Sequence, residues 1–298
     1  MAILLTLLLT LHLLCMNVSA GGPLLCVWLG RQRASGESKQ LAVQMAVWSI
    51  WLLLAGILVG LAVGMLTFSL GDRALWDVLP NFRRKIMWGM LELCFSLGWM
   101  GAYVFWFRRS PPQGAVARTL HASLPLLSAT NLLYHFPPLL TVMAKVAAGE
   151  LEVVGDVDAQ TFRSLMYQPN VLAHTLHFAW ASIAVSGVFL FRLAGKIETP
   201  RPFHILGARW ALAATAMQLP TGLWLMMTTP PAQQSRLVGG DTIVTGLFLT
   251  SMISGFYLLQ TLAAISFGED DAKLPRRSEW LLLGTVFLMT GTLHLLRN

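Results

Sequence analysis

Eight long apolar runs constrain what this chain can fold into more than any other feature of its sequence. They cover residues 3–29, 42–69, 86–107, 119–146, 165–191, 207–228, 240–267 and 279–297. A helix needs about 20 mostly apolar residues to cross the roughly 30 Å hydrocarbon core of a bilayer. The polar clusters between the runs are too short to form a soluble domain. The sequence therefore predicts an all-α, polytopic membrane helix bundle of about eight transmembrane helices, in a single domain over residues 1–298.

The composition excludes disordered chains, secreted disulfide scaffolds and ordinary soluble enzymes. Of the 298 residues, 55% are hydrophobic and 12% are charged, whereas a soluble domain has about 25% charged residues. The net charge of +7 could suggest a nucleic-acid partner. However, the basic residues are scattered over short loops, which is typical of topology signals in a membrane protein. We therefore expect contact with the lipid bilayer and no binding of nucleic acid.

The distribution of lysine and arginine predicts the orientation of the bundle. Counted over the loops after odd-numbered and even-numbered runs, these residues divide thirteen to eight. Cytoplasmic loops carry the excess, so both termini are predicted to lie outside. The first run also imitates a secretory signal peptide, because it has a small-residue ending at Val18, Ser19 and Ala20. It lacks a basic amino-terminal region and continues to Leu29, so we interpret it as a retained helix.

A short list of ionisable or ligating side chains lies inside the apolar runs, where such groups are costly and usually functional. With the predicted orientation, six potential ligands fall in the outer half of the bundle: His12, His135, His174, His177, Met252 and His294. His121 lies near the inner face, and Glu92 lies in the third run, where a carboxylate needs a partner or a proton.

Buried imidazoles and a thioether favour haem, whose iron takes His/His or His/Met pairs from facing helices. The chain has no Cys-x-x-Cys-His sequence, which excludes covalent attachment of a c-type haem. Zinc or copper fits less well, because the histidines are spread over several runs and no carboxylate pair accompanies them. The three cysteines, at positions 15, 26 and 94, are interpreted as core residues.

Each candidate also has a structural interpretation. His121 and His135 could simply form hydrogen bonds to a neighbouring helix, and Met252 alone would be a core residue. His294 lies near the chain end and could reach the membrane surface. His174 and His177 share one helical face, so one of them could be a ligand and the other its neighbour.

An ordered series of residues extends along most of the chain. It comprises His12 followed nine residues later by Gly21, Leu91-Glu92-Leu93, Ala129-Thr130-Asn131-Leu132, Gln168-Pro169 with His177 and Phe189, Met252 in Thr250-Ser251-Met252-Ile253, and Glu279-Trp280-Leu281-Leu282. In order and spacing, this series resembles subunit I of the cytochrome bd quinol oxidases.

The resemblance implies roles for several of these residues. His12 would ligate a high-spin haem, such as haem d, of an oxygen-reducing site, with His294 or His135 as the candidate second ligand. His177 and Met252 would hold a low-spin haem b. Glu92 would deliver protons or contact haem, and is the candidate catalytic residue.

The same resemblance implies one to three haems, a quinol or redox-protein electron donor, and a second membrane subunit. His174 stays an alternative to His177, because His174-Thr175 also matches a His-Thr pair of the family. The chain departs from the family at Arg84, where a second carboxylate is expected. It also lacks a ninth span and the family's Gly-Arg-Gln-Pro-Trp sequence, and it has a short loop, 229–241, in place of the long quinol-binding one.

The expected function is that of a b-type cytochrome, an oxidoreductase of the respiratory chain in the bacterial cytoplasmic (inner) membrane. It would carry electrons from a quinol or an outer-face donor to oxygen or a partner subunit. One alternative is a subunit that only relays electrons, which the short loop and Arg84 favour. The other is a transporter or assembly protein without haem, whose histidines carry protons or bind a metal. Pro137-Pro138 could interrupt a helix in such a protein.

Overall fold

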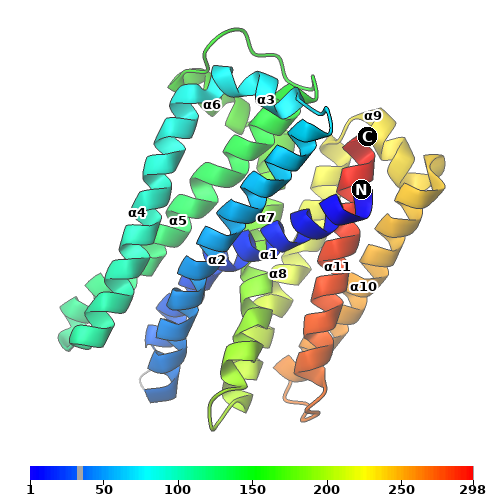
Figure 1. Cartoon of the computed structure of the whole chain (residues 1–298). Coiled ribbons are helices and arrows are strands. Elements are labelled where there is room, and N and C mark those ends of the chain that lie inside the picture. Colours follow the sequence, from blue (N-terminus) through cyan, green and yellow to red (C-terminus); the bar gives the residue numbers. More distant parts are fainter. Residues whose placement is uncertain (32–35, 298) are drawn as a thin grey trace.

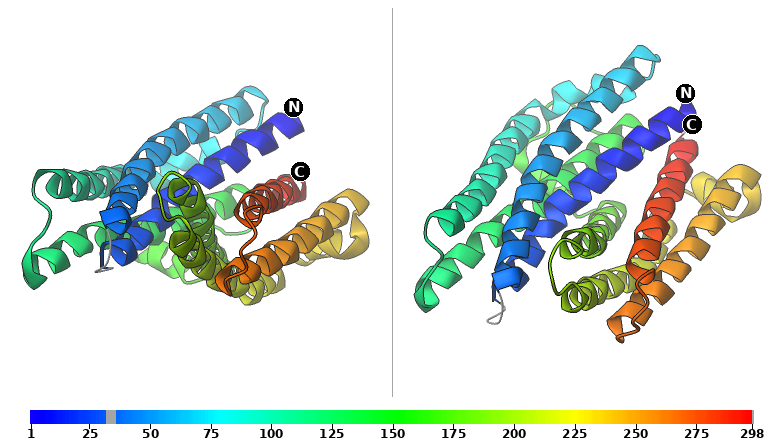
Figure 2. Two further views of the ribbon diagram at one scale, coloured as in Figure 1. Left: turned by 90° about the horizontal axis from the view of Figure 1, so that it is seen from below. Right: turned by 60° about the horizontal axis from the view of Figure 1, so that its bottom comes forward.

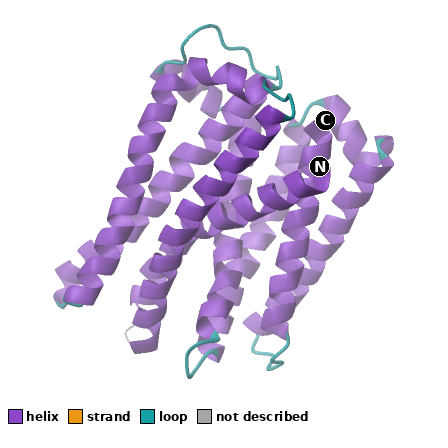
Figure 3. Cartoon of the chain, in the orientation of Figure 1, coloured by secondary structure: helices purple, strands orange, loops and turns teal. Residues whose placement is uncertain are grey.

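The computed structural model describes residues 1–31 and 36–297. Eight long helices make up most of this part of the chain (Figure 3): α1 (Ala2–Arg31), α2 (Gly36–Ser69), α4 (Arg83–Arg109), α5 (Gly114–Ala147), α7 (Pro169–Ala194), α8 (Arg201–Thr228), α10 (Thr242–Ser266) and α11 (Leu274–Arg297). Each coincides with one of the predicted runs, and the described residues contain no strand. The all-α prediction is therefore confirmed. Arg33, one of the basic residues used to predict the orientation, lies outside the described residues.

Six of the long helices are apolar and long enough to cross a membrane: α1, α2, α4, α7, α10 and α11. The protein is therefore a multi-pass membrane helix bundle. Helices α5 and α8 are of similar length; α5 contains Pro125, Pro137 and Pro138 within its helical range and α8 contains Pro220, as α1 contains Pro23.

Successive long helices run in opposite directions, so both termini lie at the same end of the bundle (Figure 1). The short helices α3 (Ala74–Val78), α6 (Ala159–Met166) and α9 (Pro231–Ser235) lie at this end as well. We call it the capped end. The α4–α5 pair forms one edge of the bundle and the α10–α11 pair the opposite edge (Figure 2).

Helix α1 is central, because it packs on α2, α5, α7 and α11. The approach of α1 to α7 is closest at Gly21, where an added Cβ would overlap the backbone carbonyl of Ser182. Beside it, the Oγ of Ser182 donates a hydrogen bond to Oδ1 of the buried Asn17, at 2.9 Å. Small residues allow helix backbones to approach closely in membranes, where the polar side chains between them need partners.

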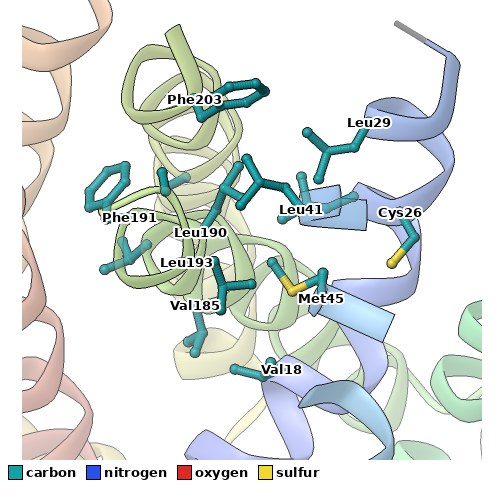
Figure 4. Packing of buried hydrophobic residues seen from close by; sticks show 14 of the residues in the cluster. Val18, Cys26, Leu29, Leu41, Met45, Val185, Leu190, Phe191, Leu193 and Phe203 are labelled. Carbon is teal, nitrogen blue, oxygen red and sulfur yellow. The ribbon is translucent and has the colours of Figure 1, made fainter. Parts of the chain in front are cut away.

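The main hydrophobic cluster lies between α1, α2, α7 and α8, towards the end opposite the capped end (Figure 4). Leu29, Leu41, Met45 and Leu190 are all buried in it. A second cluster around Phe82, Val142 and Val157 joins the 3-10 helix η1 (Leu79–Phe82) and the segment after α5 to the ends of α5 and α7. The capped end thus has a small core of its own.

One arginine joins the end of α11 to the start of α10. Arg236, in the π-helical segment η2 (Arg236–Gly240), donates to the carbonyls of Leu295 and Leu296 at 2.9 and 3.3 Å. It also lies 3.1 Å from Oδ2 of Asp241, whose Oδ1 accepts from the backbone N–H groups at the start of α10. The last carbonyls of a helix have no helical donor and attract positive charge, so Arg236 stabilises this end of α11.

Because of this arrangement, the stability of the folded protein is expected to fall at acid pH. The backbone N–H of Val244 and the Arg236 side chain hold the pKa of Asp241 below its ordinary value of 3.8. A lowered carboxyl pKa contributes stability above the ordinary value, and this is lost as pH falls from there through the lowered pKa. Asp241→Asn keeps a helix-capping side chain but removes the charge. When the pH is lowered from 3.8, we expect the melting temperature of this variant in detergent to fall less than that of the unaltered protein. Equal falls would contradict this account.

Candidate functional site

The candidate residues all lie in the halves of their helices nearer the capped end. They come from six helices: His12 from α1, Glu92 from α4, His135 from α5, His174 and His177 from α7, Met252 from α10, and His294 from α11. The helix interfaces on which they lie differ, so each must be described separately.

His12 is fixed against α2. Its Nδ1 lies 2.7 Å from the carbonyl oxygen of Gly56, and because a carbonyl only accepts, Nδ1 carries the proton and donates. The imidazole lies on Gly60, where an added Cβ would be 2.7 Å from its Cε1. Nε2 therefore keeps its lone pair. Metal-binding histidines typically have this arrangement, with one ring nitrogen oriented by a backbone carbonyl and the other available to the metal.

His177 lies between α7 and α8 and has a buried ring nitrogen. Its Nδ1 is covered and has no hydrogen-bond partner among the described residues. The side chain faces Gly222 of α8, where an added Cβ would lie 3.5 Å from Cε1. Burial of a polar atom without a partner costs about 1–3 kcal/mol. His174, its alternative, has Nδ1 3.1 Å from the carbonyl of Asn170 on its own helix.

Glu92 and His135 face each other across α4 and α5. Nε2 of His135 lies 3.5 Å from Oε1 of Glu92, and the two side chains are 38% and 28% exposed. Asn131, one turn before His135, donates to the carbonyl of Glu92 and to the Oγ of Ser96, both at 2.8 Å. These hydrogen bonds set the register of α4 against α5. The partner that a carboxylate in an apolar run requires is therefore His135.

Two other predicted ligand pairs, His177 with Met252 and His12 with His294, lie on helices whose packing must be considered in turn. Helix α8 packs on both α7 and α10, so it lies between the helices that carry His177 and Met252. His294 is near the end of α11, one turn beyond Gly291, which packs near Thr6 at the start of α1. In the described part of the chain, no three His, Cys, Asp or Glu side chains are arranged to hold a metal ion. The six potential ligands thus share a half of the bundle but not one site.

His121 has a structural role. It is buried, its ring stacks on Tyr103 with centroids 4.1 Å apart, and its Nε2 lies 3.1 Å from the carbonyl of Tyr103. Cys15 and Cys26 are buried as predicted, but Cys94 is exposed on α4, so the core prediction was wrong for this residue.

A groove lies between α5 and α7, beside the end of α6. It has a volume of about 380 Å³ and includes Tyr134 and Pro138 of α5, Tyr167 after α6, and Leu176 of α7. The sequence did not predict this groove, because its lining residues come from several runs. A much smaller void, of about 20 Å³, lies around Met16, Leu132 and Phe178 in the bundle interior.

The chain matches no protein-family model, and no curated protein matches it.

Proposed function

We propose that the chain is a membrane b-type cytochrome in which His177 and His12 each hold haem iron. The observation that carries the proposal is the buried Nδ1 of His177, which has no hydrogen-bond partner among the described residues. No hydrogen bond therefore engages this side of the imidazole, which would be available to hold iron. His12 supports the proposal independently, because its hydrogen bond to Gly56 leaves a lone pair on Nε2.

The donor chemistry of both residues fits haem. Neutral imidazole is a common protein ligand of haem iron, and both side chains lie in apolar helices. When bound, haem b supplies a one-electron couple between ferric and ferrous iron. The ring of His12 contacts α2 and that of His177 faces α8 closely. A macrocycle bound to either residue would therefore move these helices apart.

The remaining candidates take other roles in this proposal. Glu92 and His135 together hold a proton within the membrane, because one can donate to the other across the 3.5 Å between them. Met252 on α10 and His294 on α11 would be the candidate further residues to hold iron. We further propose that eight helices span a bacterial cytoplasmic membrane with both termini outside. The excess of lysine and arginine at the end opposite the capped end supports this orientation.

Visible spectroscopy of the detergent-purified protein tests the proposal. The dithionite-reduced minus oxidised spectrum is expected to contain a b-type alpha band, and His12→Ala is expected to weaken it. The matched control is His204→Gln. His204 lies in the first turns of α8, where its Nε2 is 3.4 Å from the carbonyl of Phe191. Along α8 it is several turns away from Gly222, the residue that His177 faces. An unchanged spectrum in His12→Ala would remove this residue from the proposal.

Carbon monoxide separates the oxidase from the relay subunit. An iron with an open coordination position binds carbon monoxide when reduced, whereas a six-coordinate relay haem does not. A shift of the reduced spectrum on addition of carbon monoxide would favour oxygen chemistry, and its absence would favour the relay.

A further inference from the structure

The first turn of α4 places three basic residues at the capped end of the bundle. Arg83, Arg84 and Lys85 follow one another there, and Arg163 lies on α6, which is at the same end (Figure 1). We call these four residues the basic cluster. Lysine and arginine are in excess at the opposite end of the bundle, so the topology signal does not account for a basic run at this one.

Two helices contribute to the basic cluster, and their positive charges lie close together. The charges of Arg84 on α4 and Arg163 on α6 both act on Lys85. The Nζ of Lys85 also lies 4.8 Å from the centre of the Phe162 ring on α6, a distance at which a cation and an aromatic ring attract each other. This contact holds the start of α4 beside α6. The cluster is therefore a feature of the folded chain and not only of a basic run in the sequence.

The cluster lacks a carboxylate to neutralise it. None of its four members forms an ion pair with the described residues. Asp158 acts on Lys85 electrostatically, but its Oδ1 caps α6 by accepting from the backbone N–H of Thr161, at 2.7 Å. By contrast, Lys145 at the same end of the bundle is paired with Glu150, at 2.7 Å. The excess positive charge at the start of α4 is suited to an anion from outside the chain.

The surface next to the basic cluster is apolar and lies one turn further along α4. Met87 and Trp88 are 57% and 55% exposed, and they share a face of the helix with Arg84. Tryptophan is typical of the boundary between the headgroups and the hydrocarbon core of a bilayer. Basic side chains at the end of a membrane helix extend to the headgroups. An anion bound by the cluster would therefore lie at the level of the headgroups, with hydrocarbon chains beside it.

We propose that the basic cluster binds the phosphate of an anionic phospholipid, whose acyl chains lie along Met87 and Trp88. The guanidinium groups of Arg84 and Arg163 can each donate two hydrogen bonds to phosphate oxygens, and Lys85 adds a third positive charge. A phospholipid fits better than free phosphate, because the cluster continues into an exposed apolar surface. This lipid site is independent of the proposed function and requires no haem.

Photolabelling with a lipid tests the site directly. The full-length protein is placed in phosphatidylcholine nanodiscs that contain a small fraction of phosphatidylglycerol with a diazirine in its acyl chain, and the labelled peptides are identified after illumination. We expect saturable labelling of residues 83–90 and 159–167. A phosphatidylcholine probe with the same diazirine, which has no net charge, is expected to label these residues roughly tenfold more weakly.

Charge variants at the two ends of α4 provide a matched comparison. Replacing both Arg84 and Lys85 by glutamine, a good helix former, is expected to weaken labelling of the capped end roughly tenfold or more, because each cation near a membrane surface contributes about fivefold. The control replaces Arg108 and Arg109, two exposed basic residues in the last turn of the same helix, by glutamine. It is expected to leave labelling of the capped end unchanged.

A further variant, Arg163→Gln, leaves α4 intact and is expected to weaken labelling several-fold. Arg84→Lys keeps the charge and is expected to retain most of it. Equal labelling by the phosphatidylglycerol and phosphatidylcholine probes would overturn the site, as would full labelling of the variant that lacks both Arg84 and Lys85. Loss of labelling on addition of inorganic phosphate would assign the cluster to a free anion and would overturn the lipid. Labelling that follows the charge variants in protein without haem would support the lipid site while refuting the cytochrome.

Discussion

Replacing His177 by alanine is expected to lower the haem content of the purified protein by roughly tenfold or more. The substitution removes the imidazole whose buried Nδ1 has no other partner among the described residues. Alanine is a good helix former, so α7 should persist and the loss should reflect coordination. Haem and protein are quantified on the same sample by the pyridine haemochrome assay and amino-acid analysis.

The neighbouring histidine provides the control for this experiment. His174→Ala removes a side chain one turn away on the same helix, whose Nδ1 is already engaged by the carbonyl of Asn170. We expect this variant to retain its haem. Loss of haem from His174→Ala but not from His177→Ala would assign the ligand to His174 and contradict the interpretation given to the buried nitrogen.

Replacing Gly21 by valine is expected to prevent stable folding. A Cβ at this position would overlap the carbonyl of Ser182, which belongs to the backbone of α7 and cannot rotate away. Overpacking that forces the backbone to shift typically costs about 1–3 kcal/mol, and here the overlap is with backbone atoms, so we expect a cost at the upper end of this range. The hydrogen bond between Asn17 and Ser182 lies at the same crossing and would be disturbed as well. The yield of monodisperse protein in detergent and its melting temperature measure the effect.

Gly98→Val is the matched control, because no atom lies within 4 Å of a Cβ added at that position of α4. Both substitutions place a β-branched residue within an apolar helix, so their intrinsic helix propensities are the same. Equal melting temperatures for the two variants would show that α1 and α7 are not packed as closely as described.

Hydropathy sufficed to locate the long helices, because a membrane-crossing helix needs a continuous apolar run and few other structures do. It did not find α3, α6 and α9, which are too short and polar for that signal. The fifth run was predicted to begin at residue 165. In the structure the helix is interrupted there, because α6 ends at Met166 and α7 begins at Pro169. Asp158, which caps α6 by accepting from the backbone N–H of Thr161, was the available signal for this extra helix.

The candidate site was less accessible from sequence. Depth along each helix could be counted, and it places the ligands in one half of the bundle. Which side chains meet depends on how helices are rotated and aligned, which single runs do not encode. Glu92 faces His135 because Asn131 and Ser96 align α4 with α5. Likewise, the contact of His12 with α2 depends on Gly60, a residue with no chemical signal of its own.

The haem-to-protein ratio of the unaltered chain, expressed in a haem-replete host and purified in detergent, tests the central claim most directly. The account predicts at least one haem b per chain, identified by its pyridine haemochrome, with a reduced spectrum that His177→Ala abolishes or weakens. A folded, monodisperse protein that contains no haem would contradict the account and would favour a transporter or assembly protein built around the pair of Glu92 and His135.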